Sequence, residues 1–372
     1  MKHAFIFLSL PLLISCGSSA SKQSTEAAIT LENTQIIQTK SLEIINVISL
    51  ETNADNLMGN RLRIRKYRNR LYVMDEEGKR KCLHIFDQSG SYVGKAIGEG
   101  EGPENIPSLD DFYVGSDGKL EFLSTEGDKT TIYQLTSTGS PEIKFKINYV
   151  ATSFTKLPSD EYLLYGGYNL PIIKNRVIKV SAKGEIINRY LPNEYAGKLL
   201  PMTERNFFRS GNKINFIESF NHQAYQYKED SLAPIYTIDF GQHSIPSSYW
   251  EMDYMESFPM LNEKGFGNLT GIFQGNQNTL IECMLQGPYG VNKQLLFFKE
   301  ANKPVLSIKI DEEELPVFYY PIGVDDGDDH FLFLTYHHSL RNYLTKTKQS
   351  LNFPRTESDF DFPVIISVKL VP

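Results

Sequence analysis

Short apolar strands recur along this chain, and each is introduced by a polar turn. A turn with Asn, Asp or Gly opens onto an aliphatic and aromatic strand, and a second strand follows about fifteen residues later. The first copy starts at Leu71 and reaches its turn glycine at Gly90, and the second runs from Leu120 to Gly139. The distance from strand start to turn glycine is 19 residues in both copies, which indicates a repeated structural unit.

Six copies of this unit can be found, spaced by 49, 42, 52, 66 and 51 residues. Their first strands begin at Leu71, Leu120, Tyr162, Ile214, Leu280 and Phe331. Strand-and-turn repeats of this period are typical of propellers, in which each blade is a small antiparallel sheet. Several strands are apolar throughout, as expected where stacked blades bury both faces of a sheet. The pattern predicts an all-β, six-bladed β-propeller, with a two-domain β-sandwich or a β-solenoid as alternatives.

An additional early strand predicts how the ring closes. Residues Leu42 to Leu50 form an apolar stretch before the first repeat, and Val364 to Leu370 form the last strand of the chain. Pairing of these two segments would complete the last blade and remove an exposed sheet edge.

The longest interval between repeats contains a predicted helix. Apolar residues follow one another there at spacings of four, four and three: Trp250, Tyr254, Phe258 and Leu261. Ser247 or Ser248 would cap the start of this helix, and Pro259 would stop it. Such a helix either covers a blade edge or forms a lid beside a central pocket.

The N-terminus has the pattern of an export signal. A short basic start precedes about eleven apolar residues, which are fewer than the roughly 20 that a spanning helix needs. The segment Leu13-Ile14-Ser15-Cys16 fits a lipoprotein cleavage site, with an ordinary signal peptide as the alternative. We therefore expect a signal peptide at 1–15, a lipidated Cys16 with a flexible tether over 16–40, and the propeller at 41–372. The lipid bilayer would be a partner, with the protein on the periplasmic face of the outer membrane in preference to the cell surface.

One passage resembles a known family. The segment from Ile85 to Glu104 is similar to the passage FD..G.(F/Y)...IG..G.GP.E, which joins the first two blades in six-bladed propeller lipoproteins of Bacteroidetes. These proteins are related in architecture to NHL-repeat and TolB-like propellers. The resemblance implies the same fold and a lipid anchor, and it carries no known chemistry. The chain departs from the passage at Glu104-Asn105, where many relatives have a second glycine.

Charge and cysteine content narrow the function classes. The formal net charge is −7, and no long basic run is present, so a nucleic acid is not an expected partner. The one locally basic stretch, Arg61 to Arg70, alternates with apolar residues and predicts a strand with one solvated face. Cys82 and Cys283 lie in apolar runs and are interpreted as free buried thiols, with a disulfide between them as the alternative.

Several motifs that suggest a cofactor are better explained as turns. The glycine-rich loop Gly98 to Gly102 is followed by Pro103 and not by the helix that a phosphate loop requires, so we interpret it as an interblade turn. The acidic cluster Asp325 to His330 lacks calcium-loop spacing and is interpreted as a solvated turn. Zinc-ligand spacing and a nucleophile elbow are also missing from the sequence, so no metal or other cofactor is expected.

The function predicted from the sequence is binding. The expected role is a binding or scaffolding module for a protein, peptide or glycan, and the alternative is a propeller hydrolase or lyase with a metal or carboxylate site. Converging carboxylates and histidines at the channel mouth would favour the enzyme, and an uncharged aromatic mouth would favour binding. The candidate ligand-binding residues at this mouth are Asp110, Asp111, Trp250, Tyr254, His337 and His338.

Overall fold

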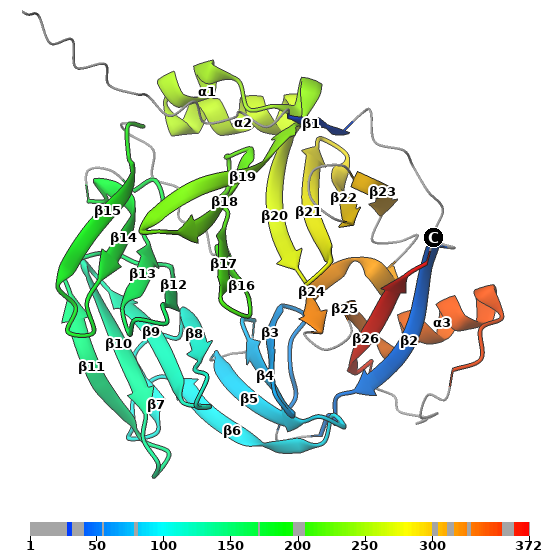
Figure 1. Ribbon diagram of the computed structural model, residues 1–372, viewed down its shortest axis with the longest axis horizontal. Coiled ribbons are helices and arrows are strands. Elements are labelled where there is room, and N and C mark those ends of the chain that lie inside the picture. The colour runs from blue at the N-terminus through cyan, green and yellow to red at the C-terminus, as the bar shows by residue number, and fades with distance from the viewer. Residues whose placement is uncertain are drawn as a thin grey trace, which may run out of the picture.

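The strands form six small sheets arranged in a ring (Figure 1). The computed structural model describes residues 28–31, 41–53, 56–77, 81–169, 172–195, 205–299, 304–310, 316–325, 329–351 and 361–371. The signal peptide and Cys16 lie outside these residues. The predicted six-bladed β-propeller is confirmed.

Each blade consists mainly of four consecutive antiparallel strands. Blade 1 comprises β3 (Leu62–Tyr67), β4 (Arg70–Asp75), β5 (Cys82–Asp87), β6 (Tyr92–Glu99) and β7 (Asn105–Ile106). Blade 2 comprises β8 (Asp111–Val114), β9 (Leu120–Glu126), β10 (Lys129–Leu135) and β11 (Pro141–Ile147). Blade 3 comprises β12 (Ser153–Lys156), β13 (Tyr162–Tyr165), β14 (Asn175–Val180) and β15 (Ile186–Pro192). Blade 4 comprises β16 (Phe207–Ser210), β17 (Lys213–Phe216), β18 (Gln223–Lys228) and β19 (Ser231–Asp239). Blade 5 comprises β20 (Phe266–Gln274), β21 (Asn278–Gly287), β22 (Gly290–Lys299) and β23 (Pro304–Ile310). Blade 6 comprises β24 (Tyr320–Asp325), β25 (His330–Tyr336), β26 (Pro363–Leu370) and β2 (Leu42–Ser49).

The six repeat starts identified in the sequence all lie on the second strand of their blades. These strands are β4, β9, β13, β17, β21 and β25. All six starting residues are buried, and the most exposed of them, Leu120, is 4% exposed. The first strand of each blade lies nearest the centre of the ring (Figure 1). The chain therefore repeats one unit that runs from the central axis outward.

The ring closes through the two ends of the propeller. Strand β2 pairs antiparallel with β26, from Leu42 opposite Leu370 to Ser49 opposite Val364, as predicted. β2 forms the outer edge of blade 6, and Figure 1 shows it beside β26, blue against red. Blade 6 is therefore assembled from both ends of the chain.

A short strand lies within the segment predicted to be a tether. β1 (Ile29–Thr30) pairs in parallel with β19 at the outer edge of blade 4, and Leu31 is buried. The tether predicted over 16–40 is thus attached to blade 4 at this point.

The apolar core lies between neighbouring blades. One cluster combines Leu71 and Val73 of blade 1 with Leu332 and Leu334 of blade 6. Another joins Phe122 of blade 2 to residues of blade 1, and others join further blades. The blades bury both faces against each other, which explains strands that are apolar at every position.

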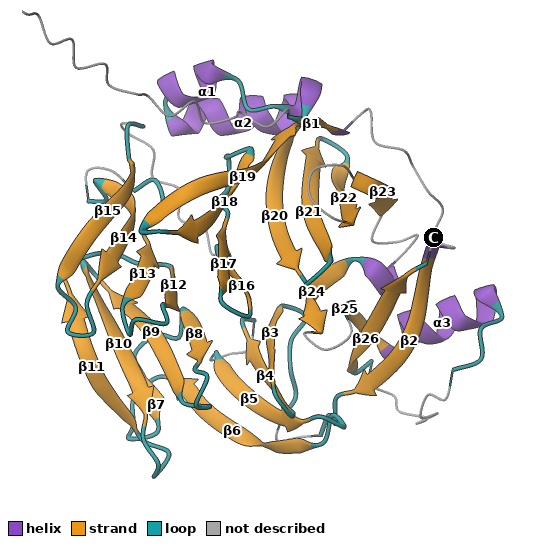
Figure 2. Ribbon diagram, in the orientation of Figure 1, coloured by secondary structure: helices purple, strands orange, loops and turns teal. Residues whose placement is uncertain are grey.

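The three α-helices lie outside the ring of blades (Figure 2). They are α1 (Ser247–Glu251), α2 (Tyr254–Lys264) and α3 (His337–Thr347). Two short 3-10 helices are η3 (Gly241–His243) and η4 (Pro316–Phe318), and Val317 and Phe318 of η4 are buried. The helix predicted in the long interval is interrupted, so α1 and α2 are two helices at the outer edge of the ring. They cover a blade edge, and they do not form a lid over the central channel.

The predicted helix boundaries at this insertion are wrong in two respects. Neither serine caps α1, which follows Pro246 without a side-chain cap, whereas the carboxylate of Asp253 accepts the Met255 N–H at the start of α2. Pro259 lies inside α2, which continues to Lys264 and ends at Gly265 with a φ of 81°. A proline removes only one backbone hydrogen bond, so packing of α2 against blade 5 can maintain the helix.

Two sequence interpretations of turns and thiols are confirmed. The glycine-rich loop joins β6 to β7, and β7 runs parallel to β6 before the chain enters blade 2. Cys82 and Cys283 are free thiols. In the described part of the chain, no helix has the length and apolar character needed to cross a membrane.

We expect the core of the closing blade to be critical for stability. Ile366 on β26 is fully buried, whereas Lys369 on the same strand is exposed. Ile366→Ala should lower the free energy of unfolding by about 2–5 kcal/mol, because it leaves a cavity between blades. Lys369→Ala should change it by less than about 0.5 kcal/mol. Equal losses for both variants in urea denaturation would contradict a tightly packed closing blade.

Candidate functional site

A cavity of about 380 Å³ lies in the central channel. Residues from five blades line it, because the first strand of each blade runs along the axis. The lining includes the following polar and aromatic side chains: Arg65, Lys66, Tyr67, Tyr113, Phe154, Thr155, Arg205, Phe207 and Arg209. We refer to it as the channel cavity.

Arg205 lines three adjoining hollows of the channel. It lines the channel cavity and also two adjoining hollows of about 30 and 240 Å³. One of its terminal nitrogens donates to the carbonyl of Ile322 at 3.1 Å, and the guanidinium lies 4.6 Å from the ring centre of Phe208. Its buried Nε has no hydrogen-bond partner among the described residues. Burial, together with the neighbouring charges of Arg65 and Arg63, lowers the pKa of Arg205. The arginine is therefore held in its charged form at an energetic disadvantage.

Arg209, four residues further on, contributes a second guanidinium. It donates to the Tyr113 hydroxyl at 3.0 Å and to the carbonyl of Lys156, and it lies over the Tyr113 ring. Burial lowers its pKa as well. Within the described residues, neither Arg205 nor Arg209 forms an ion pair with a carboxylate.

Asp111 compensates the arginines of blade 1. Its Oδ1 lies 3.0 Å from Arg63 and 2.9 Å from Arg65, and its Oδ2 accepts the Phe154 N–H at 3.0 Å. Asp111 thereby joins blades 1, 2 and 3. One carboxylate is thus shared by the two positively charged guanidinium groups of Arg63 and Arg65. Arg63 has a second partner, Glu76, at 2.7 Å.

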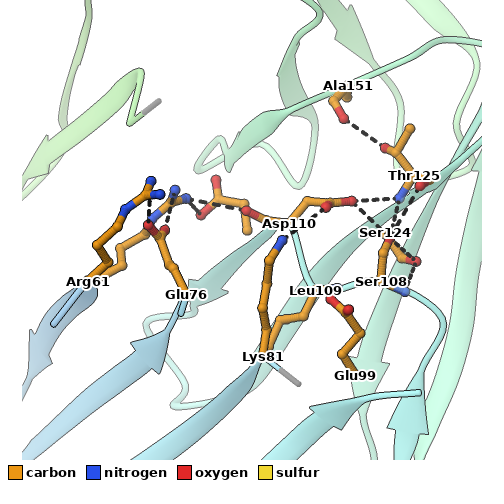
Figure 3. Close-up of polar contacts among 12 residues, drawn as sticks. Arg61, Glu76, Lys81, Glu99, Ser108, Leu109, Asp110, Ser124, Thr125 and Ala151 are labelled. Carbon is orange, nitrogen blue, oxygen red and sulfur yellow. Dashed lines mark hydrogen bonds and ion pairs between the residues drawn. The ribbon is translucent and has the colours of Figure 1, made fainter. Parts of the chain in front are cut away.

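The neighbouring Asp110 is directed away from these arginines. Its carboxylate accepts the Thr125 N–H at 2.8 Å and the Ser108 hydroxyl at 3.0 Å, and Lys81 lies 3.8 Å from it. Figure 3 shows Lys81 pointing toward Asp110, and Arg61 beside Glu76. Burial raises the pKa of Asp110. Its contacts connect the start of blade 2 with β9 and with Lys81 of blade 1, and they give Asp110 a structural role.

The channel cavity is cationic in an acidic protein. Its charged lining residues among those described are Arg65, Lys66, Arg205 and Arg209, with no Asp or Glu. The whole chain has a formal net charge of −7. Arg65 is paired with Asp111, and Lys66 lies 2.7 Å from Asp325, so Arg205 and Arg209 are the lining cations that form no ion pair among the described residues.

The other four candidate residues lie away from the channel. Trp250 on α1 lines a separate cavity at the outer rim, and Tyr254 begins α2. His337 begins α3, where it is buried and stacks on Phe362 at 4.5 Å, and His338 lies 3.0 Å from Asp361. Asp110 and Asp111 therefore lie at the start of blade 2 without lining the channel cavity, and the other four candidates lie at the periphery.

The channel arginines were not identified from the sequence. The alternation of Arg61, Arg63 and Arg65 was the available signal, and the predicted strand is confirmed as β3. The prediction of a solvated face is wrong for Arg63, which is 8% exposed because it pairs with Asp111 and Glu76. No local pattern marks Arg205 and Arg209.

The channel matches neither of the two arrangements expected from the sequence. Its centre is neither a group of histidines and carboxylates nor an uncharged aromatic surface, but a set of arginines beside aromatic rings. Across the described ranges, no group of three or more His, Cys, Asp and Glu side chains is arranged to hold a metal ion. The lining side chains supply positive charge and hydrogen-bond donors.

Comparisons with known proteins support the fold. A crystal structure of a Bacteroides fragilis protein described as exported has a TM-score of 0.70, with 14% identity over 91% of this chain and 98% of that one. Virginiamycin B lyase from Staphylococcus aureus has a TM-score of 0.42 and 12% identity over 78% and 95% of the two chains, too weak a similarity to bear on activity. No curated protein matches the chain. A family model described as Domain of unknown function (DUF4934) matches residues 27–367, so the chain belongs to this family.

The shared carboxylate predicts a strong effect on stability. Asp111→Asn removes the charge that compensates Arg63 and Arg65, and we expect it to lower the free energy of unfolding by about 3–5 kcal/mol. Asp117→Asn is a matched control, because Asp117 is exposed and its one ion pair among the described residues is with nearby Lys119. Chemical denaturation measures both variants. A loss at Asp111 no larger than at Asp117 would show that the buried pair is not needed.

Proposed function

We propose that this member of the DUF4934 family is an exported, lipid-anchored binding module whose central channel holds an anionic group of its ligand. The group would be a carboxylate, phosphate or sulfate, which share the oxygen geometry that guanidinium recognises. The observation that supports this proposal most directly is the pair Arg205 and Arg209, which project into one cavity without a carboxylate partner among the described residues.

The charge of Arg205 is incompletely compensated in the absence of a ligand. Removing a charged group from water is unfavourable unless an opposite charge and hydrogen bonds replace the water. At Arg205 a carbonyl and two aromatic rings supply only part of this replacement. A bound anion would supply the missing charge and an acceptor for Nε.

The size of the cavity is consistent with a small ligand or one end of a larger ligand. Small-molecule sites commonly measure about 300–1,000 Å³, and the channel cavity is near the lower limit. Lys66 and Tyr67 lie toward the end of β3 and also line the cavity. The anionic group would lie at Arg205 and Arg209, with the remainder of the ligand extending past Lys66.

Binding explains this site better than the enzymatic alternative. Hydrolysis or elimination needs a group that transfers a proton or activates water, commonly a histidine, carboxylate or metal ion. Charged arginines hold an anion without transferring a proton. The arginine lining therefore favours recognition over hydrolase or lyase chemistry.

The proposed location follows from the N-terminus and from the structural comparison. The leader and Cys16 have the lipoprotein pattern, and the similar Bacteroides fragilis protein is described as exported. We place the protein on the periplasmic face of the outer membrane. Several acyl chains would hold it there firmly, because each buried CH₂ contributes about 0.8 kcal/mol.

The anion proposal is tested with citrate and inorganic phosphate as probes in calorimetric titration. Arg205→Met and Arg209→Met should each weaken binding of the preferred probe by about 10–100-fold, the effect of losing a charged hydrogen bond. Lys346→Met, an exposed change on α3, should leave affinity unchanged. Raised salt should weaken binding to the wild type.

A stability measurement separates loss of a ligand contact from loss of folding. Arg205→Met should retain or raise the melting temperature without ligand, because it removes an under-compensated buried charge. Failure of both probes to bind the wild type, or an equal loss of affinity in Lys346→Met, would contradict the channel site.

The anchor is tested separately by membrane fractionation. Cys16→Ser should move the protein from the membrane fraction to the soluble fraction, because no acyl chains can be attached. Ser15→Thr keeps the cysteine and serves as the control that should remain on the membrane. Retention of the Cys16→Ser protein on membranes would contradict lipidation at this residue.

A further inference from the structure

The molecule has a second, larger cavity whose chemistry differs from that of the channel. It measures about 640 Å³ and lies at the outer rim, between blades 3, 4 and 5 and beside α1. We propose that this rim cavity binds an uncharged saccharide. The proposal does not rest on the anion site in the channel.

Aromatic rings form one wall of the rim cavity. Tyr195 and Trp250 stack with ring centres 3.9 Å apart and an interplanar angle of 25°, and Tyr168 lies 5.1 Å from Trp250. Tyr195 and Trp250 are both half-buried and line the cavity, so part of each ring remains accessible. Aromatic faces of this kind pack against the C–H surfaces of sugar rings.

The charged group within this wall is already neutralised. Arg176 lines the cavity, and its guanidinium pairs with both carboxylate oxygens of Glu218, at 2.9 and 3.1 Å. It also donates to the Pro192 carbonyl and lies 5.0 Å from the Tyr168 ring centre. An anionic ligand therefore finds no uncompensated positive charge here, unlike at Arg205.

The rim of the cavity provides polar groups suited to hydroxyls. Thr237, Ser244 and Ser247 contribute side-chain hydroxyls, and Gln223 contributes an amide. Exposed Asp239 adds a carboxylate, one oxygen of which accepts the Gly241 N–H at 2.9 Å. Donors and acceptors around an aromatic wall match a ligand that has many hydroxyls and apolar ring faces. Asp239 additionally disfavours anionic ligands.

The backbone at this site argues against a peptide bound by strand addition. An extended peptide would pair with the free edge of an outer strand. At blade 4 the end of this edge beside the cavity is paired with β1, with Ile29 opposite Ile238 and Thr30 opposite Asp239, and Ala28 itself lines the cavity. A saccharide does not bind by backbone pairing with a strand edge, so the presence of β1 does not obstruct its binding.

The sequence provides a direct reporter of occupancy. Trp250 is the only tryptophan of the chain and lies in the wall of the rim cavity. The full chain in detergent is titrated with neutral hexasaccharides, namely those of glucose in β-1,4 and α-1,4 linkage, of xylose and of mannose. We expect at least one to change tryptophan emission in a saturable manner.

Variants then locate the site. Tyr195→Ala should weaken binding of the active hexasaccharide at least tenfold, whereas Tyr289→Ala, which removes a fully exposed tyrosine, should have no effect. Arg209→Met in the channel should also leave saccharide affinity unchanged. If Tyr195→Ala does not fold, Ser244→Arg replaces it, because it fills the rim of the cavity without removing a core side chain.

Three results would overturn the proposal. The first is no saturable change with any of the neutral hexasaccharides up to about 1 mM, the concentration range of weak specific binding. The second is saturation by a pool of uncharged hexapeptides or by hexagalacturonate in place of the neutral sugars, which would show that the ligand class is wrong. The third is an equal loss of affinity in Tyr195→Ala and Tyr289→Ala, which would place the saccharide elsewhere.

Discussion

The pairing of β2 with β26 is the interaction on which the rest of the structure depends. Each blade has apolar residues on both faces, so a blade is stable only between two neighbours. An open ring would expose the sixth blade's outer edge as well as an apolar face of a terminal blade. Blade 6 avoids this because its outer strand comes from the start of the propeller and its remaining strands from the end. The central channel exists only because this closure fixes all six blades around one axis.

Closure also explains the electrostatics at the axis. First strands from different blades approach each other there, so side chains distant in sequence share a small volume with limited water. Asp111 of blade 2 compensates Arg63 and Arg65 of blade 1 and also holds the backbone of Phe154 in blade 3. Arg205 and Arg209 of blade 4 approach the same space without such a partner among the described residues. The channel therefore combines a structural ion-pair network with uncompensated charge, and the second part supports the proposed binding of an anion.

The two cavities differ in a way that separates their ligands. In the channel, Arg205 and Arg209 form no ion pair among the described residues, whereas in the rim cavity Arg176 is paired with Glu218 and aromatic rings dominate. The first therefore selects for negative charge and the second for shape and hydroxyl groups. The short strand β1 lies beside the rim cavity, so the segment that leads from the proposed anchor reaches the propeller at blade 4.

The sequence by itself determined the repeat, the number of blades and the closing pair of strands, because alternation of turns and apolar strands is a local property that folding preserves. It singled out Asp111 as a ligand-binding candidate, whereas the structure shows this carboxylate in ion pairs with Arg63 and Arg65. It misjudged the insertion, where Asp253 and the packing of α2 override the expected stop at Pro259. Tertiary structure alone decided which charges meet. Arg63 is buried because Asp111 lies opposite. Arg205 forms no ion pair among the described residues, because the nearby carboxylates Asp111 and Glu282 are paired with other cations. Residues in different blades become neighbours only when the ring closes, so no local pattern can encode their electrostatic compensation.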